Sequence, residues 1–110
     1  MAYDEALAAR IRDALAGREA ITEKKMFGGL GFLYHGNMCV GVSSQGGMIV
    51  RLGEAGDEYL DDPHVEPFAA AGGRTMSGWL LVDEDGIADT ETLEAWVDRA
   101  VGFTGSLPPK

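Results

Sequence analysis

The chain has 110 residues, 45% of them hydrophobic, which is enough to bury the core of one domain without disulfides or metals. Its net charge of -9 is concentrated in residues 53–110, which hold three bases and thirteen acids, and a surface of that sign repels duplex DNA. No apolar run approaches the roughly 18 residues that a membrane-spanning helix needs. From the charge we expect no direct contact with duplex DNA, and from the short apolar runs we expect no contact with a membrane.

The first predicted element is a helix over residues 4–17. Leu7, Ile11 and Leu15 recur every fourth residue, acids stand in the first turn, and Gly17 is a suitable C-terminal stop. The same N-terminus has acids where a signal peptide has bases, and no apolar region follows it. Together with a single cysteine, which cannot form an internal disulfide, these features predict a cytoplasmic protein.

Three short strands are predicted next, over residues 30–34, 38–42 and 48–52. The turns between them are short and contain glycine, so the strands must pair as antiparallel hairpins, because a parallel pair needs a long crossover. Alternation predicts that the apolar residues of the first two strands each follow one face. These residues are Leu30, Phe32 and Tyr34 in the first strand and Met38, Val40 and Val42 in the second.

The middle of the chain is predicted to hold one more short helix and one more strand. Residues 54–63 indicate a helix or helical turn closed by Pro63, and residues 64–74 indicate a connecting segment. Residues 75–83 form the fourth predicted strand. Its alternation directs Trp79 and Leu81 to one face and Leu80 and Val82 to the other.

The last predicted helix covers residues 89–103, with Asp89 or Thr90 as its N-cap. Residues 105–110 contain two prolines and are expected to be a disordered tail, so the domain is predicted to span residues 1–104. One apolar stripe follows the helix and consists of Leu93, Trp96, Val97, Ala100 and Val101.

This order of elements predicts an α+β fold. Strands that are grouped together, with helices at both ends of the chain, favour an antiparallel sheet of about four strands. The N- and C-terminal helices are expected to pack on one face of that sheet.

The glycine cluster at residues 28–31 has two interpretations. Glycines of a phosphate-binding loop lead into a helix, but these lead into a strand, and no nucleotide-binding motif surrounds them. The structural interpretation is that Gly28, Gly29 and Gly31 let the strand kink beneath a helix. In this interpretation Gly28 and Gly29 need either a positive φ or close backbone contact, so valine at either position mainly destabilises the fold.

His35, Cys39 and His64 are candidate ligands or catalytic groups. With a carboxylate they could supply the ligands of a zinc site, but their spacing matches no known zinc pattern. Cys39 and His35 flank one turn and could form a nucleophile–base pair, although two groups on one tight loop rarely build a pocket. The alternative is that His35 is a turn residue and Cys39 a buried, inert side chain.

The charged residues offer two further alternatives. Residues 83–86, with three acids before a glycine, fall short of a calcium loop. Lys24, Lys25 and Arg51 could form a small anion or RNA patch beside Phe27, Phe32 and Tyr34, whose rings would stack on bases. The simpler interpretation is that the rings belong to the core and the bases are solvated. We therefore assign no catalytic, cofactor-binding or metal-binding residue.

Three segments of the chain together resemble the TfoX N-terminal domain, also called the TfoX/Sxy family. They are the Lys-Met-Phe-Gly-Gly-Leu-Gly run at residues 25–31 with its following hairpin, the strand that ends at Arg51, and the Met-Ser-Gly-Trp run that starts at Met76. A final helix with Trp96 completes the pattern, which extends from about Leu7 to Val101. The sequence departs from the family pattern at Gly78 and Asp83, where an aromatic residue and a proline are usual.

The resemblance implies an α+β domain similar to a small secretion chaperone, with no established active site. Full-length relatives add a helical C-terminal domain, which these 110 residues do not contain, and regulate competence as transcriptional coactivators. We therefore expect a non-enzymatic protein-interaction module, without cofactor, that acts through a protein partner as a monomer or weak homodimer. The alternative is a small-molecule-binding protein or enzyme with a pocket near the Gly28–Gly31 kink.

Overall fold

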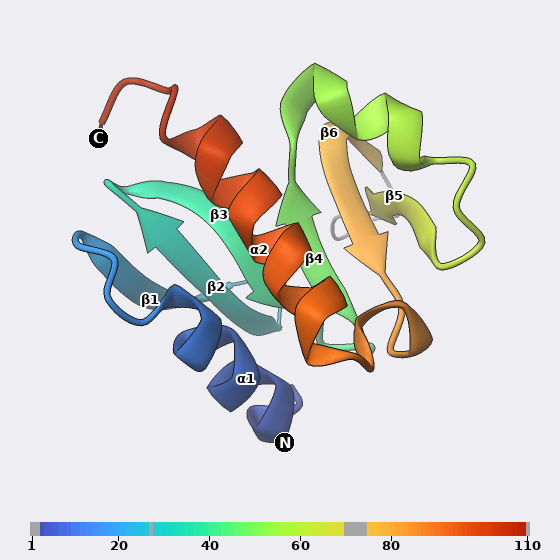
Figure 1. Ribbon diagram of the computed structural model, residues 1–110, viewed down its shortest axis with the longest axis horizontal. Coiled ribbons are helices and arrows are strands. Elements are labelled where there is room, and N and C mark those ends of the chain that lie inside the picture. Colours follow the sequence, from blue (N-terminus) through green and yellow to red (C-terminus); the bar gives the residue numbers. More distant parts are fainter. Residues whose placement is uncertain (1–2, 27, 70–74, 110) are drawn as a thin grey trace.

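The computed structural model describes residues 3–26, 28–69 and 75–109, and it has the predicted α+β architecture. Within these residues, one antiparallel sheet has six strands in the order β1-β2-β3-β4-β6-β5, and helices α1 and α2 lie on one face of it (Figure 1). The α-helices, strands and 3-10 helices (η) are α1 (Glu5–Leu15), β1 (Ile21–Met26), β2 (Gly29–Tyr34), β3 (Asn37–Val42), β4 (Met48–Arg51), η1 (Gly53–Tyr59), β5 (Val65–Ala69), β6 (Thr75–Val82), η2 (Asp85–Ile87) and α2 (Thr90–Thr104).

The sheet has two more strands than predicted, and both are edge strands. β1 pairs with β2 from Ile21 opposite Tyr34 to Met26 opposite Gly29. It was not predicted from the sequence because its glutamate and two lysines interrupt the alternation of apolar and polar residues that is typical of a strand. Charged residues are typical of edge strands because they discourage pairing with another chain. β5 occupies part of the segment predicted as a connection, and residues 70–74 of that segment lie outside the described residues. Pro67 is compatible with β5 because an edge strand needs hydrogen bonds on one side only.

Helix α1 begins and ends where the sequence predicts. The side chain of Asp4 is the N-cap and accepts hydrogen bonds from the backbone N–H groups of Ala6 and Leu7. The helix ends at Leu15, and Gly17 follows with a φ of +87°. The predicted stripe is confirmed, since its buried residues are Leu7, Ala8, Ile11 and Leu15.

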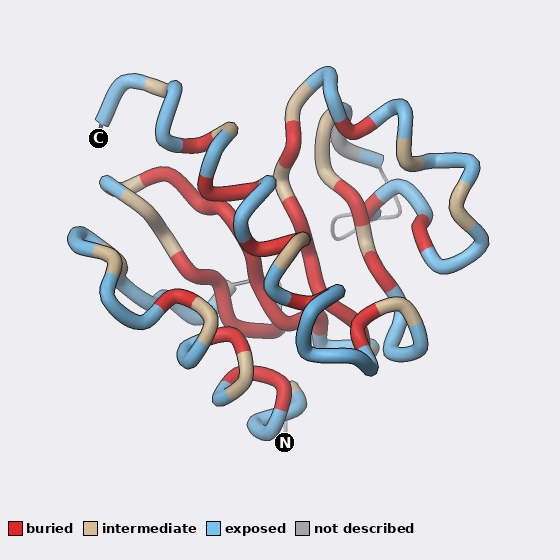
Figure 2. Tube along the Cα trace, in the orientation of Figure 1, coloured by how far each residue is buried: buried red, intermediate tan, exposed pale blue. Residues whose placement is uncertain are grey.

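Helix α2 covers the centre of the sheet and closes the main core. Its N-cap is Asp89, one of the two predicted candidates, and all five residues of the predicted stripe are buried. Figure 2 shows the buried backbone along the central strands and the inner sides of both helices. Beyond α2, the Pro108 carbonyl accepts a 3.0 Å hydrogen bond from the side-chain Nδ2 of Asn37, which joins this segment to the start of β3.

The alternation of β3 differs from the prediction because the strand contains a bulge. Phe32 pairs with Val40, but the next residue, Leu33, pairs with Met38, so Cys39 is an extra residue on β3. Cys39 therefore packs in the main core with Val40 and Val42, whereas Met38 belongs to a separate cluster. The prediction that Met38 shares a face with Val40 was wrong for this reason.

The second cluster lies on the face of the sheet away from the helices. Met38, Ile49 and Phe68 are its buried members, and Leu33, Trp79 and Leu81 pack against them. Leu80 and Val82 belong instead to the main core. The predicted alternation of β6 is thus confirmed.

The glycine cluster has a structural explanation, but not the predicted contact with a helix. Gly28 lies between β1 and β2 with a φ of +75°, in the region that favours glycine. A Cβ built on Gly29 would lie 1.9 Å from the carbonyl oxygen of Val42, so β3 and not a helix approaches this backbone. Close contact between neighbouring strands therefore explains the glycine at position 29.

Candidate functional site

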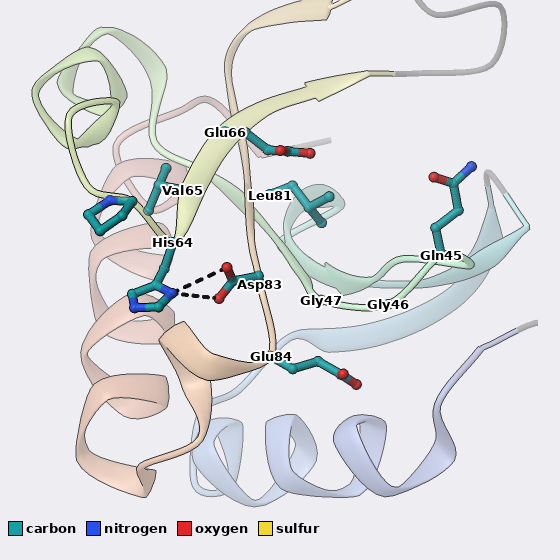
Figure 3. A pocket seen from close by; sticks show the side chains of 10 residues that line it. Gln45, Gly46, Gly47, His64, Val65, Glu66, Leu81, Asp83 and Glu84 are labelled. Atoms are coloured by element: carbon teal, nitrogen blue, oxygen red, sulfur yellow. Dashed lines mark hydrogen bonds and ion pairs between the residues drawn. The ribbon is translucent and has the colours of Figure 1, made fainter.

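A hollow of about 300 Å³ lies at the end of the sheet where the β3–β4 turn, the start of β5 and the end of β6 meet (Figure 3). We call it the acidic pocket because three of its side chains are carboxylates. It is lined by Gln45, Gly46, Gly47, Pro63, His64, Val65, Glu66, Leu81, Asp83 and Glu84.

The pairing of β5 with β6 places the polar residues of this pocket. Val65 pairs with Val82 and both are buried in the main core. Because side chains alternate along a strand, the flanking residues His64, Glu66 and Asp83 face the other way. The ladder continues one step further, where the backbone N–H of Asp83 donates a 2.9 Å hydrogen bond to the carbonyl of His64.

His64 and Asp83 form the closest side-chain contact in the pocket. The Nδ1 atom of His64 lies 3.0 Å and 3.2 Å from the two carboxylate oxygens of Asp83 (Figure 3). The hydrogen bond that the imidazole donates to Asp83 and the attraction of the carboxylate charge raise the pKa of His64 above its ordinary value of 6.5. The backbone N–H of Gly86 donates a 2.8 Å hydrogen bond to the same carboxylate. This bond, followed by the contact with His64, lowers the pKa of Asp83.

Two glycines permit the close packing around this pair. A Cβ on Gly86 would lie 2.7 Å from Cβ of His64 and 2.8 Å from Cγ1 of Val82, so a larger residue would displace the imidazole. Gly47 has a φ of +86°, and a Cβ there would lie 2.7 Å from the carbonyl oxygen of Val82. The backbone at Gly47 and Gly86 therefore packs directly around the pocket, together with the side chains that line it.

The acidic pocket has the charge of a site for a cation. Asp83 is held in its ionised form, and Glu66 and Glu84 add two exposed carboxylates. A protonated His64 neutralises part of this charge at low pH, so the negative charge of the pocket increases as the histidine loses its proton. A histidine oriented by an aspartate resembles a general base, but the lining residues include no hydroxyl or thiol that it would activate.

The three residues considered as a zinc site are not brought together. His35 is exposed in the β2–β3 turn with a φ of +53° and lies against the Tyr34 ring, whereas His64 is in the acidic pocket. Cys39 is fully buried and its Sγ donates a 3.3 Å hydrogen bond to the Phe32 carbonyl. Among the described residues, no group of three or more His, Cys, Asp or Glu side chains is placed to hold a metal ion.

The alternative in which Cys39 and His35 pair as nucleophile and base is contradicted by the same geometry. Burial raises the pKa of the Cys39 thiol to about 11, so it is not a thiolate at neutral pH. The prediction that Cys39 is a buried side chain is confirmed.

The anion or RNA patch does not form as one surface. Lys24 and Lys25 are on β1 and Arg51 is on β4, so two strands separate them. Phe32 is fully buried in the main core and cannot stack on a base, and Phe27 lies outside the described residues. Hollows lined by described residues occur elsewhere, at the acidic pocket, beside α1 and beside η1, and none of these three includes residues 28–31.

Sequence reasoning missed the acidic pocket because it did not recognise β5. His64 and Asp83 are 19 residues apart, and only the β5–β6 pairing brings them together. No signal within either segment points to the pair, because the contact depends on this strand pairing.

In the residues that the structure describes, the chain is an α+β domain with two α-helices on one sheet and hollows at the ends of the sheet. The family model of the TfoX N-terminal domain matches residues 13–104. The chain therefore belongs to the TfoX N-terminal domain family, and the resemblance inferred from its motifs is confirmed. No curated protein and no solved structure matches it. In the part of the chain that the structure describes, no helix is both long and apolar enough to cross a membrane.

Proposed function

We propose that this chain is a non-enzymatic, cytoplasmic protein-interaction module that regulates transcription or competence through a protein partner. It binds a basic segment of that partner, and one lysine or arginine side chain of the segment enters the acidic pocket. The observation that supports this proposal is that Glu66, Asp83 and Glu84 all line one hollow of about 300 Å³.

The size and electrostatics of the pocket suit a single basic side chain. Carboxylates accept two parallel hydrogen bonds from a guanidinium, and a protein acceptor of this kind gives specificity as well as affinity. The excess of acids in residues 53–110 attracts a basic partner from a distance and speeds its association. Apolar contact with Leu81 is available for the aliphatic stem of the same side chain.

The proposal is tested first with a defined probe. Nα-acetyl-L-arginine amide, titrated into ¹⁵N-labelled protein, is expected to shift the amide resonances of His64, Glu66 and Glu84. Nα-acetyl-norleucine amide, which lacks the charge, is the control and should leave them unchanged. Equal shifts with both compounds, or shifts confined to another surface, contradict the proposal.

The partner is then captured from native lysate with matched charge variants and identified by mass spectrometry. The pair Glu66→Lys and Glu84→Lys removes two carboxylates of the pocket. The pair Glu91→Lys and Glu94→Lys makes the same change of net charge on exposed positions of α2. A partner retained by the α2 variant and lost by the pocket variant supports the proposal, and a partner retained by both overturns it.

A further inference from the structure

A second hollow, of about 310 Å³, lies beside η1 at the other end of β4 (Figure 1 shows η1 directly after this strand). We call it the arginine pocket. Its walls come from the end of β4, from η1 and from the last turns of α2. It is lined by Leu52, Ala55, Tyr59, Arg99 and Phe103.

The walls of the arginine pocket are mostly apolar. Leu52 is buried at its base, and the rings of Tyr59 and Phe103 form its sides. Its volume is at the lower end of the range of small-molecule sites, about 300 to 1,000 Å³. These features favour a compact ligand with an apolar body.

Arg99 adds a positive charge that aromatic rings hold in place. Its guanidinium carbon lies 5.0 Å from the centre of the Tyr59 ring and 4.8 Å from that of Trp96. The two rings are in edge contact with each other at 5.1 Å, and Trp96 is buried. The guanidinium is therefore positioned before any ligand arrives, which lowers the entropy cost of binding.

Arg51 contributes a second guanidinium at the same end of the sheet. Its guanidinium carbon lies 5.0 Å from the ring centre of Trp79 and 5.7 Å from that of Phe103. The Phe103 ring packs closely on the backbone of Gly53, where an added Cβ would lie 2.4 Å from Cε1 of the ring. The Phe103 ring therefore lies between the apolar hollow and the guanidinium of Arg51.

The hydrogen-bond donors of Arg51 and Arg99 remain available for an anion. Ion pairs between described residues involve Arg12, Arg18 and His64, but neither of these two arginines. A guanidinium that stacks through its face keeps its N–H groups at the edge of the plane. The acids of η1 are exposed and are not among the residues that line the pocket: Glu54, Asp57 and Glu58.

We propose that the arginine pocket binds a small amphipathic carboxylate, an aromatic or medium-chain aliphatic acid. Its apolar body lies against Leu52, Tyr59 and Phe103, and its carboxylate accepts hydrogen bonds from Arg99. Arg51 provides additional attraction from the far side of Phe103. This ligand site is separate from the acidic pocket and does not depend on the proposed function.

The probe for this proposal is 4-phenylbutyrate, and its uncharged amide, 4-phenylbutanamide, is the control. Titrated into ¹⁵N-labelled protein, the acid is expected to shift the amides of Ala55, Tyr59, Arg99 and Phe103. The amide should bind about tenfold more weakly, since a charge-assisted hydrogen bond is lost. Equal affinities for both compounds, shifts elsewhere only, or no shifts up to the solubility limit of the acid would overturn the proposal.

Matched variants locate the charge and the apolar wall. Arg99→Gln is expected to weaken binding of the acid about tenfold and to leave binding of the amide nearly unchanged. Arg12→Gln makes the same change of net charge on α1, away from the pocket, and should have no effect. Ala55→Phe fills the hollow and should abolish binding of both compounds with the melting temperature retained. If Arg99→Gln and Arg12→Gln bind the acid equally, or if Ala55→Phe binds it like the parent, the proposal fails.

Discussion

The acidic pocket and the arginine pocket lie at opposite ends of β4 and have opposite charges. Gly47, directly before the strand, lines the first pocket, and Leu52, directly after it, lines the second. A strand of four residues is about 13 Å long. The two hollows have nearly the same volume, about 300 and 310 Å³, so their difference is one of chemistry and not of size.

The difference lies in how each pocket holds its charges. His64 and Asp83 are exposed and depend on each other, so pH and salt change the acidic pocket. Arg99 is held by stacking on two aromatic rings and not by an exposed ion pair. A protein of net charge -9 can thus retain a local anion site if stacking, and not a carboxylate, fixes the arginine. We expect the two pockets to respond independently when one is altered, and together when the sheet between them is altered.

The largest effect is expected from Gly29→Val, which changes the sheet and neither pocket. The new Cβ collides with the Val42 carbonyl, and overpacking of this kind costs about 3 kcal/mol. The melting temperature in calorimetry should fall by several degrees for each kcal/mol lost. Gly28→Val should also destabilise, because Gly28 has a positive φ.

The control for the sheet variants is Gly102→Val, whose added Cβ meets nothing within 4 Å. It should melt close to the parent. If Gly29→Val also melts like the parent but loses either probe ligand, the glycine cluster belongs to a site and the structural interpretation is wrong.

A smaller effect is expected from Gly53→Ala, which alters the arginine pocket alone. The substitution forces alanine into a φ of +63°, at a cost of about 1–2 kcal/mol, and pushes the Phe103 ring aside. Urea unfolding should show this loss, and binding of 4-phenylbutyrate should weaken. The pKa of His64 should not change.

Gly17→Ala separates the backbone strain from the contact with Phe103. Gly17 also has a positive φ, +87°, but its added Cβ meets nothing within 4 Å. It should lose comparable stability and keep full binding of the acid. Equal loss of binding in both variants would show that Phe103 does not shape the pocket.

A still smaller effect is expected from Asp83→Asn, which alters the acidic pocket alone. An NMR titration should place the pKa of His64 above 6.5 in the parent and nearer to 6.5 in the variant. Because the folded-state pKa is raised, the stability from this pair is fully present below 6.5 and is lost as pH rises through the folded-state pKa. The urea midpoints of parent and variant should therefore differ more at acidic pH than at alkaline pH, where only the weakened contact with the Gly86 N–H remains. An unchanged His64 pKa in the variant would rule out Asp83 as the cause.

No measurable effect is expected when duplex DNA is added to the protein at physiological salt. Arg99 in the arginine pocket and Arg51 beside it supply two guanidiniums, but the acids of residues 53–110 outweigh them. Fluorescence anisotropy of labelled DNA tests this expectation. Tight binding that weakens with added salt would show that Arg51 and Arg99 attract DNA more strongly than the acids repel it.

How well the sequence predicted each region depended on whether its signal was local. The stripes of α1 and α2 were predicted correctly because a helix places every third or fourth residue on one side. β1 and β5 were missed because edge strands bury little, and lysines or a proline interrupt their pattern. Neither pocket was predicted, because each depends on contacts between elements that are distant in the chain. The bulge at Cys39 was unpredictable for a related reason, because register depends on the partner strand as well.

The bulge that turns Cys39 inward also makes this thiol a probe for local opening of the sheet. The thiol is fully buried, is alone in the sequence and has a pKa of about 11, so a disulfide reagent cannot reach it while the sheet is closed. The rate at which an aromatic disulfide labels Cys39 would therefore measure how often the centre of the domain opens. Ligands of either pocket that bind only the closed form should slow this labelling in proportion to their occupancy.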